Sequence, residues 1–299
     1  MSLTQKKRHI VLFLGPALTL LLLILVFPIL YSINLSLFNA DGASWFNGSS
    51  SFIAFDNYIR LATDTSFLNS VWLLFLYIFA TTAIELSIAL VFAIYLDQVI
   101  QVPSWLRTLI LLPMFVLPVV SGLTFRYIFD PDGGILGQLY LLFDKEAPDM
   151  LGNQLLAFVL VVLQDVWRMW PFLFIIIFAG LKSLPKDPIE AIKLDGANFF
   201  QTCRYVIIPG IKGTITVAIL LKIIESLKAF TEIYVMTGGG PGESTTILSM
   251  YIIKQLTDFS EYGYGSAAST LLLIFGVALT MGLGLYQNRQ KQQKPEVII

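Results

Sequence analysis

Long apolar runs separated by short polar segments dominate this chain of 299 residues. Six of the runs reach the roughly 18 to 20 residues that a helix needs to cross the hydrocarbon of a bilayer. They cover about 10–35, 69–96, 106–129, 155–181, 211–236 and 267–286. A helix bonds its backbone groups internally, which suits it to lipid, where no water is available to bond them. The pattern therefore predicts an all-α polytopic membrane protein with six transmembrane helices.

The first apolar run follows the basic stretch KKRH and could be mistaken for a secretory signal. Its apolar part is about twice as long as the roughly 7 to 15 residues of a signal's apolar region. We therefore interpret it as an uncleaved first transmembrane helix that follows a short terminal segment at 1–9.

Composition agrees with a membrane protein, and the placement of the charges predicts its orientation. Charged residues make up 13% of the chain, about half of their share in an average soluble domain. Loops rich in Lys and Arg face the cytoplasm. The side that holds both termini collects twelve basic residues, namely Lys6, Lys7, Arg8, Arg107, Lys182, Lys186, Lys193, Arg204, Lys212, Arg289, Lys291 and Lys294. The opposite side has Arg60, Arg126, Lys145 and Lys254, so both termini are predicted to be cytoplasmic.

The predicted organisation is one six-helix membrane domain over 10–290, with a cytoplasmic loop at 182–212 and a cytoplasmic tail at 291–299. No basic tract of the kind that binds nucleic acid is present. The single cysteine, Cys203, excludes an intrachain disulfide and a thiolate metal cluster.

The stretch DPIEAIKLDGANFFQTCRYVIIP, from Asp187 to Pro209, is polar enough to lie in water. Asp187 suits an N-cap, Pro188 the first helical position, and Glu190 a capping box. The predicted first helix ends at Gly196, and a second helical run over 198–208 stops before Pro209. Helices this short are marginal alone, because about 12 to 15 residues are needed in water. The pair must therefore pack on its own membrane helices or on a cytoplasmic partner.

Glu190 and Ala191, followed by Gly196 and then by Val206, Ile208 and Pro209, resemble a known loop, E-A-A-x3-G-x9-I-x-L-P. That EAA loop marks the permease subunits of binding-protein-dependent ABC importers. The chain departs from it only by apolar exchanges at Ile192, Val206 and Ile208. The context LPKDPIEAIKLDGA, and MTGGGPGESTTILSMYI near the end, are similar to the sugar-permease branch that includes the larger maltose-transporter permease and the glycerol-3-phosphate and lactose permeases.

The resemblance implies a type I importer fold in a bacterial inner membrane. It also implies a second, different permease subunit, an ABC ATPase dimer that holds ATP and Mg, and an extracytoplasmic solute-binding protein. The EAA-like loop would be a coupling helix seated in the ATPase, and the solute a carbohydrate or polyol. The implied docking residues are Ile189, Glu190, Ala191, Ile192, Asp195, Gly196 and Ala197.

Four charged residues interrupt the fifth apolar run: Lys222, Glu225, Lys228 and Glu232. On one continuous helix they would form a stripe about 120° wide. Each charge at the bilayer centre costs about 2.5 to 3.5 kcal/mol on insertion scales, so the stripe cannot face lipid. One interpretation pairs Lys222 with Glu225 and Lys228 with Glu232, or lets Lys222 reach the cytoplasmic interface. The other places Glu225, Lys228 and Glu232 on the solute pathway.

The fourth run contains QDVWRMWPF, which combines Asp165 and Arg168 with Trp167 and Trp170. Charged partners suit sugar hydroxyls and aromatic faces suit sugar rings, so these residues are candidates for the solute pathway. The alternative is an Asp165–Arg168 bridge beside an interfacial aromatic belt. Glu85 stands alone in the second run and is expected to pair with a partner subunit.

Prolines offer bends in two of the predicted helices. Pro113 and Pro118 lie in the third run and Pro171 in the fourth. Each permits a kink or an unwound turn that would open carbonyl groups to a pore.

No arrangement of residues indicates an enzyme. The segment TGGGPGEST lacks the Lys-Ser/Thr pair that a P-loop requires, and no catalytic or metal-ligating constellation is present. ATP hydrolysis is expected on a separate subunit, with no cofactor bound to this chain. Alternatives are the same importer class for a phosphorylated polyol, amino acid or phosphate. An ion-coupled secondary carrier would need inverted repeats with broken helices.

Overall fold

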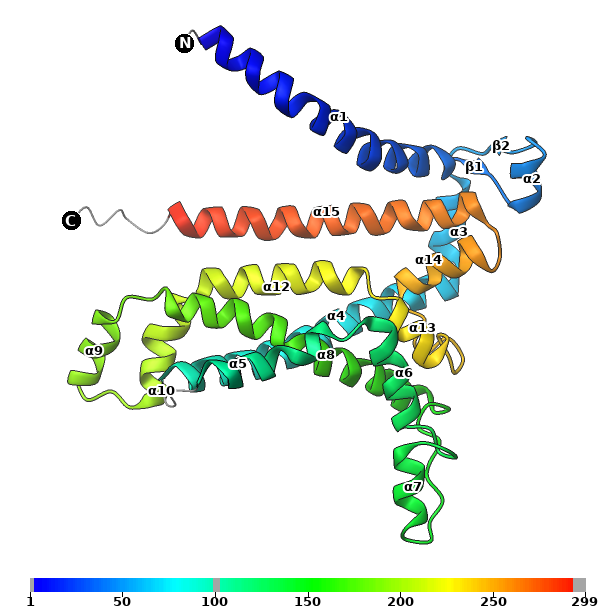
Figure 1. Cartoon of the computed structure of the whole chain (residues 1–299). Coiled ribbons are helices and arrows are strands. Elements are labelled where there is room, and N and C mark those ends of the chain that lie inside the picture. The colour runs from blue at the N-terminus through cyan, green and yellow to red at the C-terminus, as the bar shows by residue number, and fades with distance from the viewer. Residues whose placement is uncertain (1–2, 99–102, 293–299) are drawn as a thin grey trace. The chain divides into compact units, whose positions relative to one another are not determined.

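The computed structural model describes residues 3–98 and 103–292, and helices dominate this part of the chain (Figure 1). The chain divides into two compact units. The first contains the described residues up to Leu68 together with Tyr251–Ile274, and the second contains Asn69–Met250 and the described residues from Phe275. The predicted all-α character is confirmed, apart from one short hairpin.

The first unit begins with α1 (Leu3–Leu35) and a two-stranded hairpin. Strands β1 (Phe38–Asn39) and β2 (Ser51–Phe52) pair antiparallel, and α2 (Gly42–Phe46) lies between them. The side chain of Asn57, in α3 (Asp56–Thr63), donates hydrogen bonds to the carbonyl oxygens of Ser36 and Phe38 at 2.8 and 3.0 Å. The connection at 38–68 therefore contains an ordered hairpin followed by a helix.

Asp64 joins the two sequence segments of the first unit. Its carboxylate accepts hydrogen bonds from the hydroxyls of Tyr251 and Tyr264, at 2.7 and 2.6 Å. It also accepts hydrogen bonds from the backbone N–H groups of Ser66 and Phe67 at the start of α4 (Thr65–Gln98). Burial raises the pKa of Asp64, but these hydrogen bonds outweigh it and hold the pKa below its ordinary value. The residues come from α3–α4 on one side and from α14 (Leu248–Thr257) and α15 (Tyr262–Gln292) on the other.

The second unit is built on α8 (Gln154–Lys182), the most buried of the long helices. Around it lie α4, α5 (Ser104–Leu111), the 3-10 turn η1 (Leu112–Phe115), α6 (Pro118–Ile128) and α12 (Lys212–Leu227). Further on are α7 (Ile135–Leu141) and α13 (Thr231–Thr237). The hydrophobic core joins α4, α8 and the start of α12 through Ala89, Ala93, Leu173, Ile177, Ile211 and Ala218.

Four of the described helices are long and apolar enough to cross a membrane, and the number rises to six if each of two bent pairs is one span. The bent pairs are 105–115 with 118–128, at 86°, and 199–210 with 212–227, at 68°. The first bend lies between Pro113 and Pro118, where the sequence permits one. In contrast, α8 continues without a break through Pro171. The orientation of the helices across a membrane stays a prediction.

The prediction of one continuous fifth helix over 211–236 is wrong, because α12 ends at Leu227 and α13 begins at Thr231. The N–H groups of Lys228 and Ala229 bond three residues back, which tightens the last turn, and Phe230 leaves helical geometry with φ −152°. After the break α13 packs on α6. A Cβ on Gly122 of α6 would lie 2.6 Å from the carbonyl oxygen of Glu232, so only glycine allows this approach.

The polar segment forms two short helical stretches, as expected, with different ends. Helix α9 (Asp187–Leu194) has Lys186 as its N-cap and no side-chain cap, so the predicted Asp187 cap is wrong by one residue. The capping box lies instead at Asn198 and Gln201, before α10 (Phe199–Thr202). Gly196 has φ +84°, which confirms the predicted helix stop.

The second stretch does not stop before Pro209. It continues through the π-helical turn η2 (Cys203–Ile207) into α11 (Ile208–Gly210). Pro209 is tolerated because it lies in the first turn of α11, where its missing N–H is not needed.

Several residues used to predict the orientation lie outside the part of the chain that the structure describes. Residues 293–299 of the predicted tail, including Lys294, and residues 99–102 of the second cytoplasmic loop lie outside it. So do the side chains of Lys6, Lys7, Arg8, Arg289 and Lys291.

Candidate functional site

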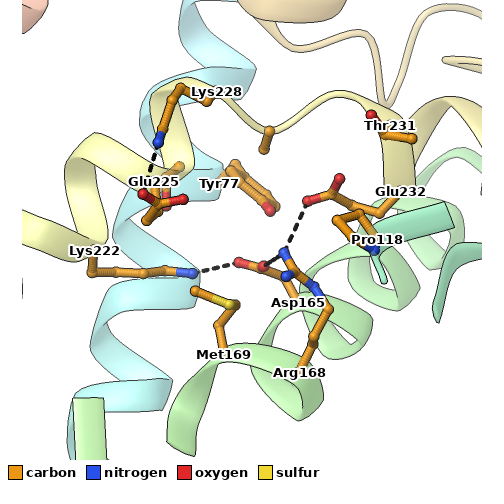
Figure 2. A pocket seen from close by; sticks show the side chains of 12 residues that line it. Tyr77, Pro118, Asp165, Arg168, Met169, Lys222, Glu225, Lys228, Thr231 and Glu232 are labelled. Carbon is orange, nitrogen blue, oxygen red and sulfur yellow. Dashed lines mark hydrogen bonds and ion pairs between the residues drawn. The ribbon is translucent and has the colours of Figure 1, made fainter. Parts of the chain in front are cut away.

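A cavity of about 190 Å³ lies in the second unit, between α4, α6, α8 and the break that separates α12 from α13. Figure 2 shows Tyr77 of α4 and Asp165, Arg168 and Met169 of α8 directed towards it. The remaining wall is Pro118 of α6 together with seven residues between Lys222 and Glu232. Because the chain leaves helical geometry at the break, side chains on both sides of it reach the same space.

Lys222 is at the centre of a buried ion-pair network. Its ammonium group lies 2.7 Å from a carboxylate oxygen of Glu85 on α4 and 2.6 Å from one of Asp165 on α8. The three side chains are 1%, 0% and 3% exposed. Charges this deeply buried are stable only when paired, because desolvation of an unpaired ion costs several kcal/mol (on the order of 3–5 when a partner is removed).

Arg168 extends the network to α13. Its guanidinium lies 3.2 Å from Glu232 and 3.6 Å from Asp165 (Figure 2). The resulting series Glu85–Lys222–Asp165–Arg168–Glu232 connects four helices, so it fixes their relative positions as well as giving each charge an opposite neighbour.

The structure corrects three of the predicted pairings. Lys222 pairs with other helices instead of Glu225, and Glu232 pairs with Arg168 instead of Lys228. The i,i+4 geometry that the second pair required is lost at the helix break. Glu85 pairs within the chain instead of with a partner subunit, and Lys222 is too buried to reach an interface. The Asp165–Arg168 bridge is confirmed.

Glu225 and Lys228 lie at the more exposed side of the cavity. They pair with each other at 2.7 Å, and their side chains are 45% and 63% exposed. This pair is therefore accessible, whereas Lys222 and Asp165 form the inner wall.

Three buried polar atoms of the lining have no hydrogen-bond partner among the described residues: Tyr77 Oη, Arg168 Nε and Ser226 Oγ. Most buried polar groups in proteins have a partner, which is often an ordered water or a ligand. A cavity needs only about 10 to 15 Å³ by the same measure to hold one water. The space is therefore large enough for a molecule that supplies the missing partners.

The two tryptophans predicted for the pathway do not line this cavity. Trp167 packs against Phe125 with ring centroids 5.7 Å apart, and Trp170 packs against Phe92 at 5.0 Å. On a helix, residues two apart point in nearly opposite directions. Asp165 and Trp167 therefore cannot both face the cavity.

The predicted docking segment presents several uncovered side chains. Glu190, Ala191, Asp195 and Gly196 are exposed, while Ile189, Ile192 and Ala197 are half-buried. Ile189 packs against the hydrophobic core of the unit, so it anchors α9 to the membrane helices.

The largest uncovered apolar side chains of the segment are Leu194, 89% exposed, and Phe200, 80% exposed. Neither residue was predicted from the sequence to be a contact residue. Their signal was the lack of a polar side chain at both positions of an otherwise hydrophilic stretch.

Among the described residues no group of three or more His, Cys, Asp or Glu could hold a metal ion. The second unit therefore contains a bundle of apolar helices around a charged cavity, and charged residues in such a setting mark a candidate functional site.

Comparison with solved structures identifies the fold. The chain superimposes on one from the crystal structure of a bacterial ABC transporter involved in the import of the acidic polysaccharide alginate, with a TM-score of 0.77, 18% identity and 98% of each chain covered. A chain from the crystal structure of an amino acid ABC transporter gives a TM-score of 0.52 at 16% identity, over 80% of this chain and all of that one. The fold is that of a type I ABC importer permease.

Residues 48–292 match the family described as the binding-protein-dependent transport system inner membrane component. The chain belongs to this family of multi-pass inner-membrane permeases, which confirms the resemblance drawn from its EAA-like loop.

Its relatives include the trehalose/maltose transport system permease protein MalF of Thermococcus litoralis, 29% identical over 89% of each chain. The sulfoquinovosyl glycerol transport system permease protein SmoG of Agrobacterium fabrum is 30% identical over 90% of this chain and 87% of its own length. The xylose/arabinose import permease protein XacH of Haloferax volcanii is 31% identical over 70% of this chain and 66% of its own.

Proposed function

We propose that this chain forms half of the translocation pathway of an ATP-driven importer for carbohydrates or polyols in a bacterial cytoplasmic membrane. The supporting observation is the family match over 48–292, with relatives named for trehalose, maltose, xylose and arabinose. A phosphorylated polyol or an amino acid would fit the same class, but no feature of the cavity favours either.

The solute pathway passes through the charged cavity. Asp165, Arg168, Glu225, Lys228 and Glu232 line it and offer donors and acceptors to solute hydroxyls. Trp167 and Trp170 would contribute by holding the aromatic layer behind α8 in place.

Coupling runs through the cytoplasmic segment 182–212. Helix α9 is anchored at Ile189 on one side and carries exposed Glu190 and Leu194 on the other. An uncovered leucine and phenylalanine on a short helix pair stabilise a complex when they enter an apolar pocket of a partner. That partner is an ABC ATPase dimer, which supplies ATP and Mg; a second permease and a solute-binding protein complete the transporter.

Site-specific crosslinking tests this proposal. A Leu194→Cys variant on a Cys203→Ser background carries a bifunctional thiol-to-amine crosslinker in native membranes. We expect it to capture a nucleotide-binding subunit, and Asp132→Cys, exposed in the turn between α6 and α7, to serve as the matched control. Capture of no nucleotide-binding subunit at residue 194, or equal capture at both, would contradict the proposal.

A second readout separates docking from assembly. Gly196→Pro cannot adopt φ +84°, so the turn between α9 and α10 must change. We expect ATP hydrolysis to continue while solute uptake falls by at least tenfold, with the protein still in the membrane. Glu190→Lys should act in the same direction, and normal uptake by both variants would reject the coupling role.

A further inference from the structure

The cations that line the cavity are all committed to carboxylates of the same chain. Lys222 contacts Glu85 and Asp165 at 2.7 and 2.6 Å. Arg168 contacts Glu232 and Asp165 at 3.2 and 3.6 Å. The remaining cation, Lys228, pairs with Glu225 at 2.7 Å.

Carboxylates equal or outnumber cations in this network. The lining contains the cations Lys222, Arg168 and Lys228 and the carboxylates Asp165, Glu225 and Glu232. Glu85 adds a fourth carboxylate behind Lys222, so the formal sum of three positive and four negative charges is −1. An anionic solute would have to separate an existing pair or lie beside a surplus carboxylate, and both are unfavourable in a site shielded from water.

In contrast to the charged groups, three polar atoms of the cavity lining remain available for hydrogen bonds to a solute. Tyr77 is fully buried and Ser226 is 2% exposed, and within the part of the chain that the structure describes the hydroxyls of both lack hydrogen-bond partners, as does Arg168 Nε. A hydroxyl group both donates and accepts, so a solute rich in hydroxyls satisfies all three without disturbing any ion pair.

Building on the proposed function, we propose that the cavity selects a hydroxyl-rich solute that carries no negative charge and discriminates against carboxylate, phosphate or sulfonate groups. Glu225 is the specificity-determining residue, because it is an acid at the more exposed side of the cavity, where it pairs with Lys228 (Figure 2). Its charge therefore meets an entering solute before the inner wall does. Solute names among similar proteins range from trehalose and maltose to an acidic polysaccharide. Family membership therefore leaves solute charge open, and the paired cations decide it.

Three sugars that differ in one substituent test the proposal: glucose, glucosamine and glucuronate. The chain is purified from its membrane with the subunits that accompany it, and binding is measured by isothermal titration calorimetry. We expect glucose and glucosamine to bind within about threefold of each other and glucuronate at least tenfold more weakly. Glucuronate binding as tightly as glucose would overturn the proposal.

A charge reversal assigns the discrimination to this cavity. Glu225→Lys removes the partner of Lys228 and leaves two uncommitted cations at the accessible side. We expect the affinity for glucuronate to rise at least tenfold. Asp132→Lys, a charge reversal of the same sign in an exposed turn away from the cavity, should leave the affinity for glucuronate unchanged. An unchanged Glu225→Lys variant, or an equal gain in both, would contradict the inference.

The crosslinking at residue 194 distinguishes the two levels of the hypothesis. If none of the sugars binds while the ATPase is still captured, the cavity is not the solute site and the inference fails alone. If the sugars bind as expected but no ATPase is captured, the proposed importer function fails instead.

Discussion

At the scale of single residues, the cost of burying charge explains the geometry around Lys222. A lone ammonium in this position would face a penalty of several kcal/mol, and two carboxylates on different helices remove it. The same pairing makes Lys222 a structural residue first, because it fixes α12 against both α4 and α8.

Replacing Lys222 by methionine should be strongly destabilising. It leaves Glu85 and Asp165 buried without a cation, and loss of one partner of a buried pair costs about 3 to 5 kcal/mol. Thermal unfolding of the purified protein in detergent measures the effect. Lys228→Met breaks the pair with Glu225, whose two side chains are 63% and 45% exposed. It should lower the free energy of unfolding by less than about 1 kcal/mol. Equal melting temperatures for the two variants would refute this account.

Asp64 gives the first unit a predictable response to acid. Burial raises its pKa, but the hydrogen bonds from Tyr264, Tyr251 and the backbone outweigh it and lower the pKa of Asp64 on folding. A carboxyl group with a lowered folded pKa contributes stability above its unfolded pKa, about 3.9. That contribution disappears as the pH falls through the lowered value.

The substitution Tyr251→Phe should therefore move acid unfolding to higher pH. It removes one donor to the Asp64 carboxylate, so the folded pKa of Asp64 rises and its stabilisation is lost earlier on acidification. Circular dichroism across an acid titration records the midpoint. Tyr58→Phe removes a hydroxyl contact to neutral Ser36 and should leave the midpoint unchanged; a matching shift there would exclude Asp64 as the cause.

At the scale of elements, the break between α12 and α13 determines what the cavity contains. On a continuous helix Glu232 would lie one turn beyond Lys228. Because α13 instead packs on α6 at Gly122, Glu232 reaches Arg168. The contact between α13 and α6 requires glycine at residue 122, because a Cβ there would meet the backbone of Glu232. Backbone cannot move aside as a flexible side chain can.

We expect Gly122→Ala to destabilise the protein by about 1 to 3 kcal/mol, the usual cost of overpacking, and to lower solute uptake. Thermal unfolding together with an uptake assay tests both effects. Gly213→Ala, in α12, is the matched control, since a Cβ there meets none of the described atoms within 4 Å. Alanine should be neutral or mildly stabilising at that position. A stable and active Gly122→Ala variant would remove the role assigned to this contact.

At the scale of the whole molecule, the number of membrane crossings depends on how the bent helix pairs are counted. Four described helices qualify alone and two bent pairs raise the number to six. Six crossings, the number reached when each bent pair is one span, would place both ends of the chain on the same side, and the basic loops predict that this side is the cytoplasm.

Reporter fusions should therefore give the same signal at both ends. Fluorescent protein joined after residue 299 should fluoresce and alkaline phosphatase at the same position should be inactive, with identical behaviour for fusions before residue 1. Alkaline phosphatase inserted between Asp132 and Gly133 should be active and serves as the positive control. Opposite signals at the two ends would require an odd number of crossings and would reject the six-helix topology.

The sequence by itself determined the features that depend on local composition. Apolar length predicted the four long helices that run without a break, the EAA-like loop predicted the family, and the φ requirement at Gly196 predicted the turn after α9. These properties follow from a few neighbouring residues, so they can be read without knowing which segments meet.

Only the tertiary structure decided the ion pairs and the composition of the cavity. Lys222 has a possible partner three residues away in Glu225, yet it pairs with residues 137 and 57 positions distant, Glu85 and Asp165. The choice depends on helix packing and on the break at Lys228–Phe230, beyond which α13 lies in close contact with Gly122. Charges in a low-dielectric interior pair with whatever group the packing brings within about 3 Å, and sequence spacing does not determine which group that is.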